Sequence, residues 1–274
     1  MIRDITIGQY YPAKSVLHRL DPRVKIMCTF LFLISLFLFK SIPVYAVATL
    51  FLIIIIRLSH VPVKFIMKGL KPIIMLLMIT VIFNLFLTSG GKILLHVWIF
   101  KITEQGMRTA VYMGIRLIYL IIGSSIMTFT TTPNALTDGI ESLLYPLNKI
   151  KVPVHEIAMM MSIALRFIPI LLEETDKIMK AQIARGADLE SGNIIHKAKS
   201  MIPILVPLFV SAFRRANDLA MAMESRCYRG GEGRTKMKPL IYKRRDYMAY
   251  AGVISYLAVL ILAGRFLPFH IWIF

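Results

Sequence analysis

Five long apolar runs constrain this chain more than any other feature of its sequence. They lie at about residues 26–39, 44–56, 72–88, 110–129 and 247–264. The fourth and fifth approach the roughly 20 residues that an α-helix needs to cross a bilayer, whereas the first two are short and need their flanks to span it. Since 57% of the 274 residues are hydrophobic, the chain carries more apolar surface than one soluble core needs. The sequence therefore predicts an all-α membrane protein with about five transmembrane helices.

Most of the positive charges lie before the first run, between the second and third runs, and between the fourth and fifth runs. The chain has 33 Lys and Arg residues against 15 Asp and Glu, a formal net charge of +18. Placing residues 1–25, 57–71 and 130–246 inside the cell puts 27 of the 33 on the cytoplasmic side, as the positive-inside rule favours. We therefore expect a multi-pass protein of the cell membrane, with its N-terminus and residues 130–246 in the cytoplasm. This distribution explains the charge without a nucleic-acid partner.

These assignments divide the chain into four parts. A cytoplasmic lead covers residues 1–25, transmembrane helices one to four cover 26–129, a cytoplasmic or interfacial domain covers 130–246, and the last transmembrane helix with an outer tail covers 247–274. The domain at 130–246 has the pattern of about three long amphipathic helices. We predict that their apolar parts lie in or against the membrane and that their charged ends project into the cytoplasm.

Caps and breakers set the expected limits of those three helices. The first begins after Thr132, a good cap, with Pro133 in the first turn. The second runs from about Val154 to Ala184 and stops at a glycine, and the third runs from about Ile194 to Tyr228. A polar turn, ESGN, separates the last two, and GGEGRTK at 230–236 is expected to link the third to the final span.

The second and third of these helices end in the same small-Arg-small pattern. One copy is Ala184-Arg185-Gly186, and the other, 41 residues later, is Ser225-Arg226-Cys227. Small flanks let a partner approach the backbone while the guanidinium reaches carboxylate or carbonyl oxygens. The alternative is that each arginine only complements the helix dipole, an effect of about 0.3–1 kcal/mol. Two copies ending two helices of one domain favour docking.

Catalytic and cofactor motifs find little support in the sequence. The six histidines are scattered without zinc-binding spacing, the two cysteines are far apart, and no phosphate-binding GxxxxGK[ST] loop is present. Arg116 is the one charged residue within a predicted span, and we expect its side chain to snorkel to the membrane surface. We therefore predict no catalytic residue, no metal site and no bound cofactor in this chain. A membrane-embedded enzyme with an unrecognised site stays open as an alternative.

Three stretches, taken together and in order, resemble a known family. They are the lead IGQYYPAKSVLHRLDPRVKI, the ARG and SRC motifs, and the stretch AMESRCYRGGEGRTK. They are similar to the corresponding stretches of the transmembrane T components of energy-coupling factor (ECF) transporters, in the version that serves many substrate-binding partners. The resemblance covers essentially the whole chain. One departure is Ser-Arg-Cys where Ala-Arg-Gly is the commoner form, and it keeps the small-Arg-small chemistry.

The resemblance implies a non-catalytic coupling subunit of an ABC-type importer. Its expected partners are two cytoplasmic ATPases, which bind the ATP, and interchangeable membrane-embedded S components that capture vitamins or other micronutrients. In that family the two arginine motifs end crossed coupling helices, and Arg185 and Arg226 hold those positions here. The methionine clusters at 159–161 and 221–223 are candidate contacts for S components, with core packing as the alternative. A dedicated T component of a cobalt, nickel or biotin system is the alternative within the family.

Overall fold

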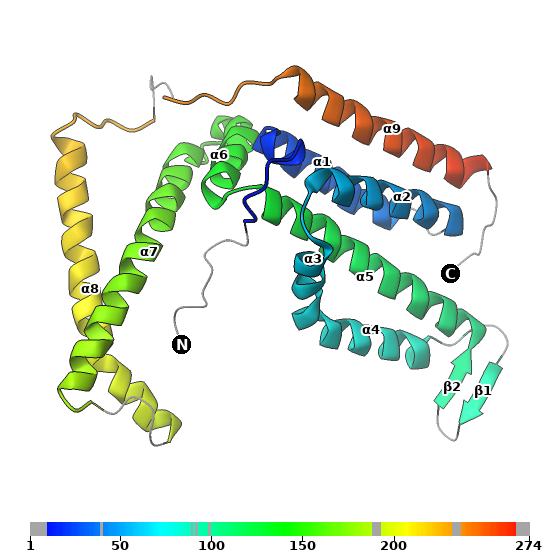
Figure 1. The fold of residues 1–274 in the computed structure, drawn as a ribbon, viewed down its shortest axis with the longest axis horizontal. Helices are drawn as coiled ribbons and strands as arrows, with labels where there is room; N and C mark the ends of the chain where they lie inside the picture. The colour runs from blue at the N-terminus through cyan, green and yellow to red at the C-terminus, as the bar shows by residue number, and fades with distance from the viewer. Residues whose placement is uncertain are drawn as a thin grey trace. The chain divides into compact units, whose positions relative to one another are not determined.

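The computed structural model describes residues 10–38, 41–88, 90, 93–97, 100–187, 193–231 and 237–266. Its described elements are nine α-helices, several short 3-10 turns and one hairpin (Figure 1). The α-helices are α1 (Pro22–Leu38), α2 (Ile42–Ser59), α3 (Val63–Leu70), α4 (Ile74–Leu87), α5 (Glu104–Thr130), α6 (Pro133–Leu144), α7 (Val154–Ala184), α8 (Ile194–Glu224) and α9 (Arg244–Phe266). The hairpin joins β1 (Ile93–Val97) to β2 (Phe100–Thr103), which pair in an antiparallel register.

Four helical segments among the described residues are long and apolar enough to cross a membrane. They are Val63–Phe86, Glu104–Thr130, Val154–Ala184 and Arg244–Arg265. Three of them overlap predicted spans, and α2 is an apolar helix of shorter length. The segment Val154–Ala184 lies in the predicted cytoplasmic or interfacial domain and qualifies because its first half is mostly apolar. The all-α membrane class is confirmed, and the hairpin is a small addition that the sequence pattern does not predict.

The chain divides into two compact units. One contains residues 141–239, with α7 and α8, and the other contains residues 8–140 and 240–274, with α1 to α5 and α9. The boundary falls within α6, which begins where predicted: the amide of Ala135 donates to Oγ1 of Thr132 at 3.3 Å. Most of the predicted turn ESGN and of the linker GGEGRTK lies outside the described residues.

Helices α1, α2, α5 and α9 pack together in the second of these units. Their core is apolar, and a hydroxyl pair, Ser35 Oγ and Tyr256 OH at 3.0 Å, joins α1 to α9. Because lipid cannot satisfy polar groups, such internal pairing is what a membrane interior requires. The buried side chains at the centre of this core are Phe32, Leu36, Val44, Ala48, Leu52, Tyr256 and Leu260.

The snorkelling predicted for Arg116 is wrong. This residue is only 7% exposed, and its Nε donates to the hydroxyl of Tyr45 at 3.2 Å. Its guanidinium also lies 5.3 Å from the ring centroid of Phe37. A hydroxyl acceptor and an aromatic face let the cation stay inside the helix bundle, so it does not have to extend to the membrane surface.

The start of α9 is fixed by a buried carboxylate. Asp246 is 1% exposed, and its Oδ2 accepts from the amide of Lys243 at 2.7 Å, as a third-position acid does in a capping box. Its Oδ1 accepts from the amide of Asp21 at 2.9 Å, just before α1. One carboxylate therefore caps α9 and joins it to the start of α1.

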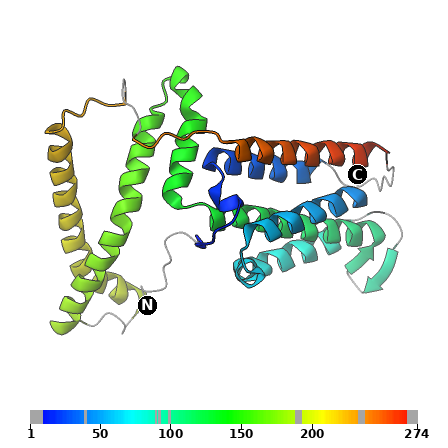
Figure 2. The same cartoon turned by 45° about the horizontal axis from the view of Figure 1, so that its top comes forward.

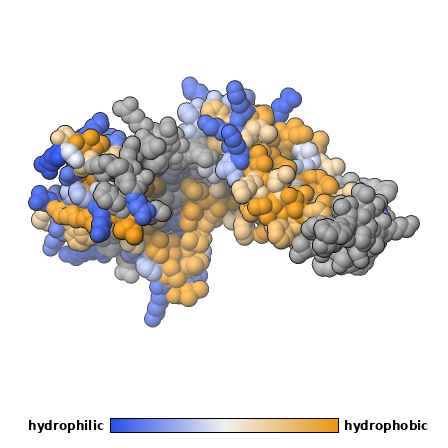
Figure 3. All heavy atoms as spheres, turned by 90° about the horizontal axis from the view of Figure 1, so that it is seen from below, coloured by the Kyte–Doolittle hydropathy of each residue, from blue (hydrophilic) through white to orange (hydrophobic). Residues whose placement is uncertain are grey.

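Apolar side chains cover much of the outer surface of this unit (Figure 3). The exposed ones on α4 alone are Ile74, Met75, Leu76, Met78, Ile79, Ile82 and Phe83. A soluble monomer rarely exposes so large an apolar patch, whereas lipid accepts it at no cost. The surface therefore agrees with a unit that lies in a bilayer.

Candidate functional site

The ARG motif lies at the point where α7 ends. The helix stops at Ala184, where the sequence predicts it to stop. The amide of Gly186 then donates to the carbonyl of Ile183 at 2.9 Å, and that of Ala187 donates to the carbonyl of Gln182 at 3.0 Å. These two bonds form a Schellman motif, which requires a left-handed residue at the turn. Gly186, with φ of 87°, supplies it.

The SRC motif closes α8 with the same two hydrogen bonds. The amide of Cys227 donates to the carbonyl of Glu224 at 2.8 Å, and that of Tyr228 donates to the carbonyl of Met223 at 3.0 Å. Cys227 takes the left-handed position with φ of 55°. Helix α8 therefore ends at Glu224, four residues before the predicted end at Tyr228, because the turn reverses the chain.

Arg185 and Arg226 occupy the same position in the two turns. Each directly precedes the left-handed residue, and each is exposed, as are its small neighbours. Among the described residues, no hydrogen bond or ion pair engages either guanidinium. Two arginines in matching backbone frames are therefore presented to the surroundings.

Helices α7 and α8 lie side by side and run antiparallel (Figures 1 and 2). Arg215 Nη2 donates to Oε2 of Glu174 at 2.9 Å, and Nε2 of Gln182 donates to the carbonyl of Pro203 at 3.3 Å. The first contact joins the middle of the pair, and the second lies near the end of α7. The two helices therefore point their arginine motifs toward opposite ends of the pair.

The Glu174–Arg215 ion pair relates the two helices to each other. Glu174 and Arg215 are 41 positions apart, as Arg185 and Arg226 are. Arg185 follows Glu174 by eleven residues in α7, and Arg226 follows Arg215 by eleven residues in α8. Eleven helical residues span about 16 Å, so the two arginines lie about 33 Å apart along the pair. The helix pair therefore has two equivalent arms, residues 174–186 at the end of α7 and residues 215–227 at the end of α8, one on each side of the Glu174–Arg215 contact.

The Glu174–Arg215 ion pair was not among the sites predicted from the sequence. A signal for it exists, because the acidic pair at 173–174 and the basic pair at 214–215 have the same 41-residue spacing as the two motifs. Opposite charges at equivalent positions of two antiparallel helices meet where the helices cross. The spacing of the motifs alone does not indicate that contact.

Both helices also expose apolar side chains along their length. Met160 and Met161 of the first methionine cluster are exposed, as is Met221 of the second. Such a surface needs either lipid or another protein to cover it. The remaining large exposed apolar residues of α7 and α8 are Ile157, Ile168, Ile183, Ile195, Met201, Ile202, Leu205, Val206, Phe209, Val210 and Phe213.

The described residues contain no group of three or more His, Cys, Asp or Glu side chains placed to hold a metal ion. Nδ1 of His155 lies 3.0 Å from Oε1 of Glu141, on the side of the fold that carries α7. The two side chains form a hydrogen-bonded pair. The arrangement at the ends of α7 and α8 is suited to holding a partner, because it offers cations and open backbone at fixed separation.

Most of the chain matches a known protein family. Residues 13–237 match the family described as CbiQ, cobalt transport protein. The matched range contains both arginine motifs and most of the described helices.

Individual relatives are similar over nearly their whole length. The "energy-coupling factor transporter transmembrane protein EcfT" of Clostridium kluyveri is 57% identical over 250 residues, which cover 91% of this chain and 93% of the relative. The proteins of the same name in Ruminiclostridium cellulolyticum and Bacillus subtilis are 56% and 48% identical. They cover 96% and 95% of this chain, and 98% of each relative.

Proposed function

The chain belongs to the CbiQ family of cobalt transport proteins, and from that premise we propose that it is the coupling subunit of an ECF-type ABC importer. In this role it transmits the ATP-driven motion of two cytoplasmic ATPases to a membrane-embedded S component, for uptake of vitamins or other micronutrients. The chain itself carries out no catalysis, and ATP binds to the ATPase subunits. The observation that carries the proposal is the pair of exposed arginines in matching helix-end turns.

Each arginine motif docks one ATPase. Two equivalent arms about 33 Å apart fit two similar partners better than one. The guanidinium of Arg185 or Arg226 reaches carboxylate or carbonyl oxygens in a groove of its ATPase, while the small flanks allow close approach. Since both arms belong to one ion-paired helix pair, movement of one ATPase relative to the other changes the angle between α7 and α8.

The S component covers the exposed apolar faces of α7 and α8. Methionine suits a surface that accepts different partners, because its unbranched thioether side chain adapts to different shapes. Met160, Met161 and Met221 are exposed in positions where they contribute to such a surface. Motion of the two helices is then passed directly to the substrate-binding subunit.

The N-terminus and residues 130–246 face the cytoplasm, where the ATPases and their ATP are. The distribution of Lys and Arg supports this orientation. A reporter inserted at residues 230–234 should therefore be cytoplasmic, and an external reporter there would contradict the orientation.

Charge reversal tests the docking. A charge-assisted contact in a partly desolvated groove contributes about 2–5 kcal/mol, so we expect Arg185→Glu or Arg226→Glu to weaken uptake strongly and the double variant to abolish it. The double variant should insert into the membrane at normal levels yet fail to pull down the ATPases. Lys177→Glu, a reversal at an exposed cation of α7 that lies two turns before the motif, serves as the matched control.

The alternative role of these arginines predicts a different result. A helix-end charge that only complements the dipole contributes under about 1 kcal/mol, and its reversal leaves assembly intact. Undiminished ATPase binding and full uptake by the double variant would therefore remove the docking role.

A dedicated cobalt, nickel or biotin T component is a second candidate, because the matched family is described as a cobalt transport protein. Copurification from the native membrane separates the two. Several different S components in the complex support a shared subunit, and a single one supports a dedicated subunit. Activity of the isolated chain without ATPases would instead indicate an enzyme.

A further inference from the structure

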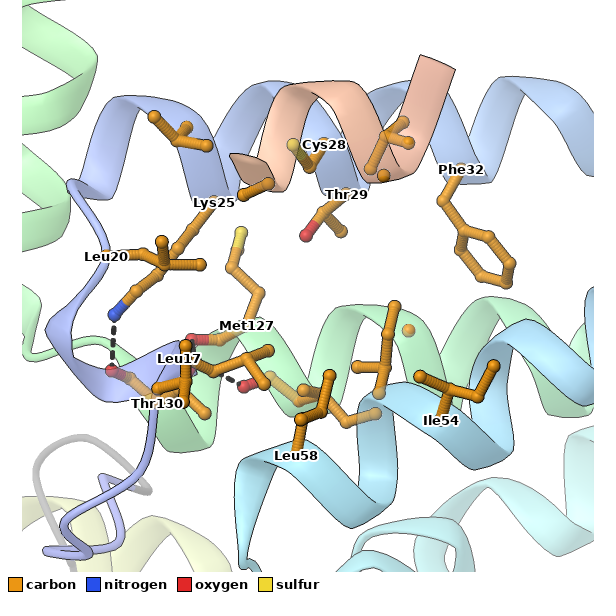
Figure 4. Close-up of a pocket in the computed structure, with 18 of the residues that line it drawn as sticks. Leu17, Leu20, Lys25, Cys28, Thr29, Phe32, Ile54, Leu58, Met127 and Thr130 are labelled. Atoms are coloured by element: carbon orange, nitrogen blue, oxygen red, sulfur yellow. Dashed lines mark hydrogen bonds between the residues drawn. The ribbon is translucent and has the colours of Figure 1, made fainter. Parts of the chain in front are cut away.

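An apolar cavity of about 420 Å³ lies among α1, α2, α5 and α9, within one unit of the fold. Its wall is formed largely by aliphatic and aromatic side chains, including Phe32, Phe51, Ile54 and Val253 (Figure 4). The volume falls in the range of about 300–1,000 Å³ that is usual for ligand sites. The proposed docking of ATPases makes no use of this cavity.

Two cations lie at one end of the cavity. Lys25 and Arg245 both line it, and the Lys25 ammonium donates to the carbonyl of Thr130 at 2.8 Å and to that of His18 at 3.3 Å. The Nε of Arg245 is buried and has no hydrogen-bond partner among the described residues. A buried donor without a partner is costly, so an acceptor supplied by another molecule would stabilise the site.

The carboxylates near these cations are already engaged. Asp21 accepts hydrogen bonds from the amide and the guanidinium of Arg23, with the Nη2 to Oδ2 distance at 3.0 Å. Asp246 accepts from the amides of Asp21 and Lys243, as described above. Asp21 is neutralised by Arg23, so Asp246 offsets one of the two cations Lys25 and Arg245, and one positive charge remains for an anion in the cavity.

One end of the cavity is cationic and the other is apolar, which matches the two ends of an amphiphilic lipid. Lys25 and Thr130 lie toward one end, and Phe32 and Ile54 lie toward the other (Figure 4). The cationic end is at the start of α1 and α9 and the end of α5, where a helix bundle meets the membrane surface. The apolar end lies deeper along the same helices. A polar, water-soluble ligand would find few hydrogen-bonding groups on this wall.

We propose that this cavity binds an anionic membrane phospholipid. One acyl chain lies among α1, α2, α5 and α9, and the phosphate accepts from Arg245, with Lys25 adding positive charge. Basic pockets between transmembrane helices are a recurrent way to hold anionic lipid headgroups. The lipid fills the space between α9 and helices α1 and α2 that their side chains do not occupy, and so connects the three helices.

Native mass spectrometry of the full chain, released from phosphatidylglycerol or phosphatidylcholine nanodiscs, tests the headgroup. The wild-type chain should retain one phosphatidylglycerol, with at least a tenfold preference over phosphatidylcholine. Arg245→Gln should lose that preference. The matched control is Arg244→Gln, because Arg244 is the exposed neighbour and does not line the cavity.

A second pair of variants tests the acyl chain. Gly252 lines the cavity, and a Cβ there would meet open space, so the leucine of Gly252→Leu can occupy the chain site. This variant should retain less of both lipids, whereas Ala251→Leu, at an exposed position outside the lining, should bind as the wild type does. Glycerol phosphate, which lacks acyl chains, should not displace the lipid.

A measurement on the unaltered chain guards against misfolded variants. Cys28 lines the cavity and Cys227 is exposed at the end of α8, so thiol alkylation can be compared within one protein. Phosphatidylglycerol should slow alkylation of Cys28 at least fivefold relative to phosphatidylcholine and leave Cys227 unchanged.

Four results would overturn the proposal: equal alkylation of Cys28 in both lipids, equal headgroup preference of the wild type and Arg245→Gln, unchanged lipid retention by Gly252→Leu, or displacement of the lipid by glycerol phosphate. Since the ATPases take no part in these measurements, their outcome is independent of the docking proposal.

Discussion

At the scale of single residues, the backbone of the residue after each arginine decides where the guanidinium points. Gly186 and Cys227 both adopt positive φ, and each turn reverses the chain directly after Arg185 or Arg226. Glycine adopts this conformation freely, but a residue with a Cβ does so at a cost of about 1–2 kcal/mol. The SRC turn is therefore less stable than the ARG turn with the same hydrogen bonds.

This difference predicts opposite effects of two substitutions. Cys227→Gly should stabilise the last turn of α8 by up to about 1 kcal/mol, and Gly186→Ala should destabilise the last turn of α7 by a similar amount. Hydrogen exchange of the amides in each turn reports local opening, so it should slow up to about fivefold in the first variant and quicken in the second. Unchanged exchange in both variants would show that the turns are held by other contacts.

The positions of these residues are predictable from the sequence, whereas the geometry of the second turn is not. The repeated small-Arg-small pattern identifies both motifs, and Gly186 indicates where α7 stops. A cysteine seldom takes a left-handed conformation, so the earlier end of α8 is not predictable from residue preference alone. Arg116 shows the same limit, since its partners Tyr45 and Phe37 come from elements distant in sequence.

At the scale of elements, α7 and α8 act as one pair around the Glu174–Arg215 contact. Both side chains are partly exposed, at 29% and 39%, so the pair adds little to overall stability. The ion pair instead fixes how α7 and α8 align along each other, because like charges at this crossing would repel each other even in folded helices. Long helices with proline or glycine at their ends are the elements that the sequence predicts best. The β1–β2 hairpin escapes prediction because its strands are only five and four residues long.

Exchanging the charges of this pair tests its role in holding the two arms. Glu174→Arg and Arg215→Glu should each broaden the distance distribution between spin labels at positions 183 and 224, and the double exchange should narrow it again. The native cysteines, Cys28 and Cys227, are replaced by serine in all proteins compared. Equal widths in the wild type, both single variants and the exchange would show that other contacts set the register.

At the scale of the whole molecule, two units of different character share one chain. One carries the core of α1, α2, α5 and α9, and the other carries the paired helices with their two arginines. The apolar runs predict the membrane class, because lipid exposure leaves a strong compositional signal. They do not predict which long apolar helix spans the bilayer, as α7 meets the criteria for a span within the predicted cytoplasmic or interfacial domain.

Photocrosslinking from equivalent positions tests most directly whether the two arms dock two ATPases. A photoreactive residue at Ile183 or Glu224, each exposed directly before its motif's small-Arg-small triplet, should capture one ATPase, and both together should capture two ATPases per chain. Matched positions fifteen residues earlier, Ile168 and Phe209, are also exposed and should capture lipid or a membrane subunit instead. Capture of no ATPase from positions 183 and 224, or equal capture from all four positions, would contradict the account.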